Sequence, residues 1–303
     1  MTKISPFHEG ELEVQRLAGE QEIATKVGDL IQETVLPRAL DFIRQQSVIW
    51  IGIEDQENLL WAFPLFGSPG FINPNEGEMI EIYLGKKHAI PDKWLSYLKK
   101  GKSIACLVIE LSSRRRVRIN GIIQGINEGR LEIDVQQTYP NCPKYIRKRE
   151  LQGEPDLYQF HYKSSGTAIN AQLENIINQS DTAFVASNGP NGADVSHRGG
   201  ASGFIKCESD NKITVPDYKG NSMFNTLGNF KANPFGGLII IEFNQDYYLQ
   251  LTGKINICFN KEHPKLTTGG TNRFWELVIH KWQLFQLESN FKWESLDFSP
   301  HNP

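Results

Sequence analysis

Hydrophobic and polar residues follow two different patterns along the chain. In residues 1–46 apolar side chains recur at three- and four-residue steps, as at Ile23, Val27 and Leu30. This spacing places them on one face of an α-helix. The pattern therefore predicts an N-terminal helical arm, and Pro37 is expected to open its last helix.

Beyond residue 46 the pattern changes to short apolar or alternating runs separated by turn residues. These runs are 47–53, 58–66, 70–72, 79–84, 104–111, 116–126, 131–135, 203–206, 213–215, 236–243, 247–259 and 273–285. Runs of this length and period are typical of β-strands. We therefore expect a mainly β protein of barrel type with flanking helices, including a short helix near Trp94 and another at Met223–Phe230.

The order of these elements recurs about 133 residues later in the chain. Matching positions are Ser47 and Ser180, Gly70-Phe71-Ile72 and Gly203-Phe204-Ile205, and Ile80 and Ile213. After a one-residue shift, an offset of 132 relates Ile109-Glu110-Leu111 to Ile241-Glu242-Phe243 and Gly121 to Gly253. A shared offset of this kind predicts two copies of one barrel in a single chain.

The predicted division has three parts. Residues 1–46 form the arm, residues 47–150 a first, degenerate copy, and residues 151–303 a second copy. Residues 136–150 are expected to join the copies, and residues 151–175 to form a linker and a helix.

Two polar, glycine-rich segments flank a pair of apolar runs in the second copy. Residues 196–200 read SHRGG and precede the run 203–206, while residues 216–221 read PDYKGN and follow the run 213–215. A turn at Glu208–Asn211 predicts a hairpin that carries both polar segments at its open end. Charged donors and backbone N–H groups exposed by glycine suit a phosphate group. A polar hairpin rim without a ligand is the alternative.

The segments SHRGGASGF, PDYKGN and TLGN, in this order, resemble the flavin-binding core of the pyridoxamine 5'-phosphate oxidase-like family, the FMN-binding split β-barrels. Ser202 stands where the family pattern usually has proline. Family members usually act as homodimers with the flavin at the subunit interface. The resemblance therefore implies two tandem split barrels that form an internal pseudo-dimer, with FMN bound between them.

The two copies differ at the motif. Where the second copy has SHRGG, the first has the apolar segment FPLFG at residues 63–67, and its counterpart of PDYKGN, near Lys86 and Lys87, lacks the Asp and Asn pattern. We therefore expect one phosphate site. The first copy is expected to contribute through NCPKYI at residues 141–146, which resembles an element of relatives after the last barrel strand.

The resemblance and the local residue types together give the candidate site. A helix starting near Asn221 is expected to direct its first N–H groups toward the phosphate. The predicted cofactor-binding residues are Ser196, His197, Arg198, Gly199, Gly200, Asp217, Tyr218, Lys219, Asn221, Ser222 and Thr226 from the second copy, and Lys144, Tyr145 and Arg147 from the first. His197 is the candidate catalytic residue, either as a proton donor or as a hydrogen-bonded anchor. For His8, Glu9 and Glu11 we expect a structural role.

Two functions from different classes are consistent with the candidate site residues and the family resemblance. The first is an FMN-dependent oxidoreductase acting on an unidentified small molecule. The second is a non-catalytic flavin- or haem-binding protein, such as a sensor, a carrier or a haem-handling protein. Gly220-Asn221-Ser222 replaces the Ser-Arg-Lys triplet usual in the family, which argues against true pyridoxamine phosphate oxidase activity.

Composition narrows the partners and the compartment. A net charge of −3 with 22% charged residues gives no reason to expect nucleic-acid binding, and no apolar run approaches the roughly 20 residues of a membrane helix. The four cysteines lie far apart without a CxxC pair, so we expect a reducing cytoplasm and no metal site. The expected partners are a small-molecule substrate or electron donor. The expected state is a monomeric pseudo-dimer or a homodimer.

Overall fold

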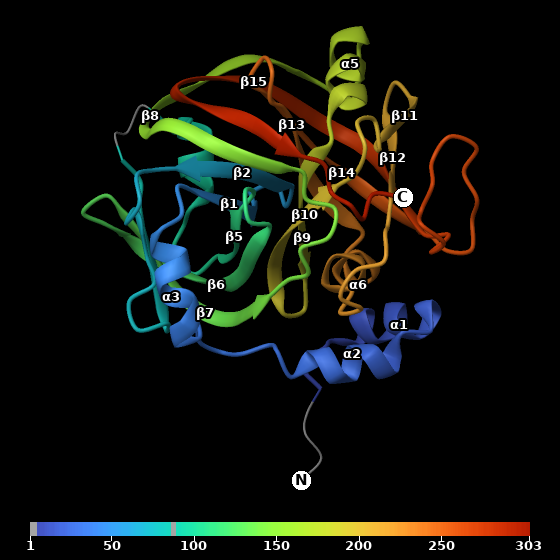
Figure 1. Cartoon of the computed structure of the whole chain (residues 1–303), viewed down its shortest axis with the longest axis horizontal. Helices are drawn as coiled ribbons and strands as arrows, with labels where there is room; N and C mark the ends of the chain where they lie inside the picture. Colours follow the sequence, from blue (N-terminus) through green and yellow to red (C-terminus); the bar gives the residue numbers. More distant parts are fainter. Residues whose placement is uncertain (1–4, 86–88) are drawn as a thin grey trace.

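The computed structural model describes residues 5–85 and 89–303, so Lys86 and Lys87 lie outside the described residues. Two antiparallel sheets lie side by side, and the helices of the N-terminal arm pack along one side of them (Figure 1). The described helices are α1 (Glu9–Ala18), α2 (Gln21–Gly28), α3 (Pro37–Arg44), α4 (Asp92–Tyr97), α5 (Ala171–Gln179) and α6 (Asn225–Ala232).

The N-terminal arm has the predicted helices, and local chemistry explains their ends. The His8 side chain accepts a hydrogen bond from the Gly10 N–H, while Glu11 accepts one from the His8 N–H at 2.9 Å. This reciprocal capping box begins α1. Gly19 ends the same helix at φ 68°, a conformation that glycine adopts at little cost. Pro37 occupies the start of α3, as predicted.

The first sheet has strand order β2-β1-β5-β6-β7-β4-β3. Its strands are β1 (Val48–Glu54), β2 (Leu60–Phe66), β3 (Ile72–Asn73), β4 (Met79–Tyr83), β5 (Ser103–Glu110), β6 (Arg115–Asn127) and β7 (Arg130–Pro140). Each named pair is antiparallel, and the path is open rather than a closed barrel.

The second sheet repeats this order as β10-β9-β13-β14-β15-β12-β11. Its strands are β9 (Thr182–Gly189), β10 (Gly192–Gly199), β11 (Lys206–Ser209), β12 (Lys212–Pro216), β13 (Phe235–Glu242), β14 (Tyr247–Cys258) and β15 (Phe274–Asp297), with β8 (Lys148–Gly166) added beside β15. The common order confirms the prediction of a mainly β chain with two tandem copies of one fold.

Backbone details repeat at the predicted offsets. Phe71 donates its N–H to the Ser68 carbonyl, and Phe204 donates to the Ala201 carbonyl, both at 3.0 Å. Gly121 and Gly253 both stand where the strand register shifts. A Cβ on either would lie 2.1 or 2.0 Å from a carbonyl oxygen of the next strand, so only glycine fits the close approach.

Four local predictions were wrong. Residues 151–166 are not a linker but most of β8, and the hairpin strand begins at Lys206 in β11, so Gly203–Ile205 is a loop. The hairpin turn is Asp210–Asn211 instead of the longer turn we predicted. Helix α6 begins at Asn225, because Phe224 before it has φ 62° and cannot continue a helix.

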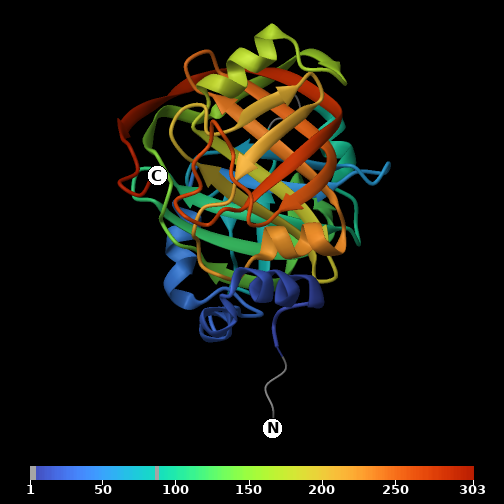
Figure 2. The ribbon, with the colours of Figure 1, turned by 90° about the vertical axis from the view of Figure 1, so that its right-hand side faces the viewer.

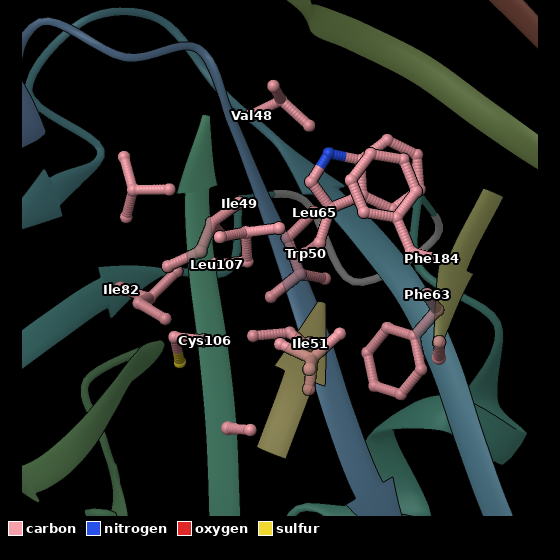
Figure 3. Close-up of a cluster of buried hydrophobic side chains, with 14 of the residues drawn as sticks. Val48, Ile49, Trp50, Ile51, Phe63, Leu65, Ile82, Cys106, Leu107 and Phe184 are labelled. Carbon is pink, nitrogen blue, oxygen red and sulfur yellow. The ribbon is translucent and has the colours of Figure 1, made fainter. Parts of the chain in front are cut away.

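The two copies share one apolar core where β1 lies against β9. Trp50 stacks on Phe184 with ring centroids 3.6 Å apart and an interplanar angle of 10° (Figure 3). Strand registers place Phe184 at the position in the second copy that Trp50 has in the first, 134 residues earlier. Contact between equivalent positions is the mark of a two-fold axis, so this pair lies at the pseudo-two-fold between the copies.

Candidate functional site

A cavity of about 100 Å³ lies between the two copies. The first copy contributes β6 and the segment after β7. The second copy contributes the end of β10, the loop after β12 and the start of α6. The open end of the predicted hairpin is therefore part of this site, and the two polar segments meet, because Arg198 Nη1 donates to Asp217 Oδ1 at 2.9 Å.

Most of the predicted site residues line this cavity. They are His197, Arg198, Gly199, Asp217, Tyr218, Asn221, Ser222, Thr226, Lys144 and Tyr145. Four others lie outside the lining. Ser196 is buried behind it with its Oγ 2.9 Å from Thr226 Oγ1, Gly200 lies against Phe204, Lys219 is exposed, and Arg147 pairs with Asp181 at 2.7 Å.

Sequence reasoning missed Arg116 and Arg118, which project from β6 of the first copy into the cavity. Alternate residues of a strand share one face, so the two arginines lie side by side. Asn225 was also missed, whereas Asn141 belongs to the predicted NCPKYI segment. The available signal was the alternation of Arg116, Arg118 and Asn120 in RRRVRIN, a polar face on a strand whose other face is apolar.

Positive charge exceeds negative charge at the cavity wall. Its lining has four basic residues, Arg116, Arg118, Lys144 and Arg198, and one acidic residue, Asp217. Asp217 is shared, because its second oxygen accepts from Arg273 Nε at 3.0 Å. Burial, together with the nearby charges of Arg118 and Arg198, lowers the pKa of Arg116 to about 9. Buried cations that repel one another are stabilised by an anion.

Several buried nitrogen atoms at the cavity have no hydrogen-bond partner in the part of the chain that the structure describes. Within the described residues, Arg118 Nε, Arg198 Nε and His197 Nε2 are buried without a hydrogen bond. Unpaired buried polar groups cost about 1–3 kcal/mol each, so native proteins rarely leave several together. Their concentration on the wall of one cavity indicates a bound polar group that satisfies them.

His197 is neutral at physiological pH. Burial lowers its pKa well below the usual value, and the charges of Arg116, Arg198 and Arg149 lower it further. Its ring meets the edge of Phe184, 5.4 Å away, which fixes its orientation. His197 is therefore suited to form a hydrogen bond as a neutral imidazole, and a cationic acid role does not fit its surroundings.

Two tyrosines from different copies form the mouth of the cavity. The rings of Tyr145 and Tyr218 lie 4.8 Å apart at 38°, and Tyr145 Oη donates to the Lys219 carbonyl at 3.1 Å. Gly199 permits this approach, because a Cβ there would lie 2.1 Å from the Tyr145 carbonyl oxygen. Gly199 of the SHRGG motif thus has a steric reason, because the two copies touch at this point.

Backbone strain gathers at the same wall. Tyr145, Ser222 and Phe224 all have φ between 62° and 64°, a region that costs a non-glycine residue about 1–3 kcal/mol. Tyr145 is held by its N–H, which donates to Ser299 Oγ at 3.1 Å, and Ser222 Oγ donates to Glu20 Oε2 at 2.5 Å. Strain of this kind is kept where surrounding contacts position functional groups.

The N-terminal arm supports the arginine cluster, by which we mean Arg116, Arg118 and Arg198. Helix α1 packs directly beside α6 (Figure 2), and a Cβ at Gly10 would lie 2.4 Å from the Gly228 carbonyl oxygen. Glu11 accepts a hydrogen bond from Asn225 Nδ2 at 2.6 Å, and Asn225 Oδ1 accepts one from Arg118 Nη1 at 3.3 Å. The arm thus orients Arg118 through Asn225, which agrees with the structural role expected for Glu11.

Glu11 gives a prediction on pH. Burial raises its pKa to about 7, so the folded state keeps a proton that the unfolded state releases near pH 4.5. Stability from this group is present at low pH and is lost as pH rises through that window. We expect Glu11→Gln to gain stability relative to the natural protein from pH 5 to pH 8 in urea unfolding. A difference that is constant over this range would contradict the assignment.

Aromatic rings line the corresponding region of the first copy, where a cavity of about 470 Å³ lies beside Phe66 and Tyr158. Phe66 takes the place there that Gly199 has in the second copy, and its ring centroid lies 5.3 Å from that of Tyr158 and 4.8 Å from that of Phe291. Apolar packing therefore replaces the polar donors of the motif.

Neither a metal-binding cluster nor a membrane-spanning helix lies in the described ranges, 5–85 and 89–303. No group of three or more His, Cys, Asp or Glu side chains in these ranges is placed to hold a metal ion. No helix in them combines the length and apolar character needed to cross a bilayer.

Comparison with known proteins gives matches among solved structures. A putative pyridoxamine 5'-phosphate oxidase from Lactobacillus delbrueckii shares 10% identity at a TM-score of 0.32 over 39% of this chain and 94% of its own. A FAD-binding protein from Mesorhizobium loti shares 11% at 0.29 over 42% and 100%. A pyridoxamine 5'-phosphate oxidase-related, FMN-binding protein from Nostoc punctiforme shares 8% at 0.28 over 44% and 100%.

No family model matches the chain, and no curated protein does either. The structural matches agree with the family that the SHRGG and PDYKGN motifs resemble. At these TM-scores they carry no argument of their own. The fold assignment rests on the strand order shared by the two sheets.

Proposed function

We propose that this protein is a flavoprotein that binds FMN at the interface of its two copies and acts as an oxidoreductase on a small molecule. The observation that carries the proposal is the arginine cluster Arg116, Arg118 and Arg198, which gives one cavity an excess of positive charge, with Arg118 Nε and Arg198 Nε buried and unpaired. Guanidinium groups bind phosphate through paired, charge-assisted hydrogen bonds. The motif resemblance supports a flavin as the owner of that phosphate.

The residues present fit the phosphate end of such a cofactor. Three arginines from two copies surround the cavity, and the first residues of α6, Asn225 and Thr226, bring the positive end of a helix to it. The enclosed volume of about 100 Å³ is below the roughly 300–1,000 Å³ of a complete small-molecule site. We therefore assign the enclosed part to the phosphate end, and the tyrosine pair at the mouth to the ring end.

FMN, when bound, supplies hydride or electron transfer. The chain's own residues position it: Arg198 and Arg118 hold the phosphate, and Asp217 and Asp194 orient these arginines at 2.9 and 3.3 Å. Neutral His197 donates or accepts one hydrogen bond at the cavity wall. Tyr145 and Tyr218 shield the mouth from water.

The surroundings of His197 among the described residues do not favour the haem alternative. A haem ligand role for His197 needs a flat macrocycle to reach its Nε2 atom, which is buried close to the charges of Arg116 and Arg198. Cationic surroundings also oppose the approach of a positively charged iron.

A comparison of FMN with riboflavin tests the proposed function. The two ligands share the ring and differ in the phosphate, so their affinities isolate the arginine cluster. We expect riboflavin to bind flavin-free protein at least about 100-fold more weakly, since two charge-assisted contacts contribute about 1.5–3 kcal/mol each. Fluorescence quenching titrations measure both constants. Equal affinities would exclude the cluster as a phosphate site.

A further inference from the structure

A second basic surface adjoins the cavity between the two copies, which we call the flavin cavity. A groove of about 410 Å³ lies between α3, the start of β6 and the segment after β7. Its lining has four arginines, Arg38, Arg114, Arg115 and Arg116, and no acidic residue. We call it the arginine groove. Its volume falls within the range of small-molecule sites.

The arginine groove and the flavin cavity share a wall. Arg116 and Asn141 line both, and Arg116 Nε donates to the Cys142 carbonyl at 2.9 Å, which holds the wall in place. Both polar atoms of the Asn141 amide are buried without a partner among the described residues. An amide left unpaired between two basic hollows is poised to bind a ligand that lies along them.

The charges in the arginine groove differ in how they are held. Arg114 is occupied, because it pairs with Asp297 and donates to the carbonyls of Ile146 and Phe298. Arg115 stacks over the Phe42 ring at 4.4 Å, and no ion pair within the described residues involves Arg115 or Arg38. Stacking fixes the side chain of Arg115 while its donors stay available.

We propose that the arginine groove binds the phosphate groups of a nucleotide next to the bound flavin. Arg38, Arg115 and Arg116 provide the forked donors that phosphate oxygens accept. The groove also has an apolar wall, formed by Val117, Pro140 and Pro143. Such a wall suits the flat base of a nucleotide, whereas inorganic phosphate would have no use for it. The nucleotide is either the adenylate half of FAD or a separate dinucleotide donor. The position beside the flavin rests on the proposed function, whereas the groove itself does not.

The test titrates three forms of the full chain with FMN, FAD and ADP, using flavin fluorescence for the first two and calorimetry for ADP. The forms are the natural protein, Arg38→Gln/Arg115→Gln, and the control Arg16→Gln/Lys163→Gln, which removes two exposed charges far from the groove in sequence. ADP is titrated into both flavin-free and FMN-loaded protein at one ionic strength.

We expect the groove variant to bind ADP at least about tenfold more weakly than the other two forms, with FMN affinity unchanged. A parallel loss for FAD identifies the nucleotide as part of the cofactor. Unchanged FAD affinity identifies it as a separate donor. The proposal is overturned if ADP binds none of the forms, binds all three equally, or if FMN affinity falls as much as ADP affinity. Binding of ADP without any flavin binding would overturn the proposed function, but it would still support a nucleotide site in the arginine groove.

Discussion

Replacing Arg198 by alanine is expected to weaken FMN binding by about 1.5–3 kcal/mol, or about 10- to 150-fold. Arg198 lines the cavity, its Nε is buried without a partner, and Asp217 holds its other end. The phosphate therefore loses a positioned, charge-assisted donor. Asp217 keeps its bond to Arg273 in the variant, so it is not left as an uncompensated buried charge. Titration of flavin-free protein measures the change.

Lys219→Ala is the matched control for Arg198→Ala. It removes one positive charge from the same motif, but Lys219 is exposed and outside the cavity lining. Its effect is expected to stay within about 0.5 kcal/mol. Circular dichroism of both variants checks that they fold. Unchanged FMN affinity in folded Arg198→Ala would remove Arg198 from the site, whatever the control shows.

Replacing Trp50 by alanine is expected to lower the free energy of unfolding by about 3–5 kcal/mol. Trp50 is buried and stacks on Phe184 of the other copy, so its loss leaves a cavity at the pseudo-two-fold axis. Both copies contribute to the core around this pair, and we expect them to unfold together. Urea unfolding followed by tryptophan fluorescence and by circular dichroism measures the change.

Trp50→Phe is the control for this substitution, because it keeps a ring on Phe184 and removes the indole N–H, which is buried without a partner. Its cost is expected to stay below about 1.5 kcal/mol. Two separate transitions in Trp50→Ala, with one copy keeping its natural stability, would contradict the account of an apolar core shared by both copies.

The repeat could be predicted from the sequence because steric requirements recur at fixed positions. Gly121 and Gly253 stand at equivalent bulges where a Cβ would meet a carbonyl oxygen, so both copies keep glycine there. Gly199 of the SHRGG motif could be identified for a similar reason, because it has to leave room for Tyr145.

Other features could not be predicted because they depend on how the copies meet. Strand β8 pairs with β15, and its polar sequence, with Pro155 inside a register shift, lacks the apolar alternation of a core strand. Arg116 and Arg118 read as an exposed strand face until the second copy covers it. Helix α6 begins at Asn225 because Phe224 before it has φ 62°. The conformational preferences of the residue types do not predict that angle.

The visible absorption spectrum of freshly purified protein, followed by that of the supernatant after denaturation, tests the central claim most directly. We expect a flavin spectrum in the native protein and release of FMN into the supernatant. A colourless protein that also fails to bind added FMN would contradict the proposal of FMN binding. A Soret band would indicate haem binding in its place.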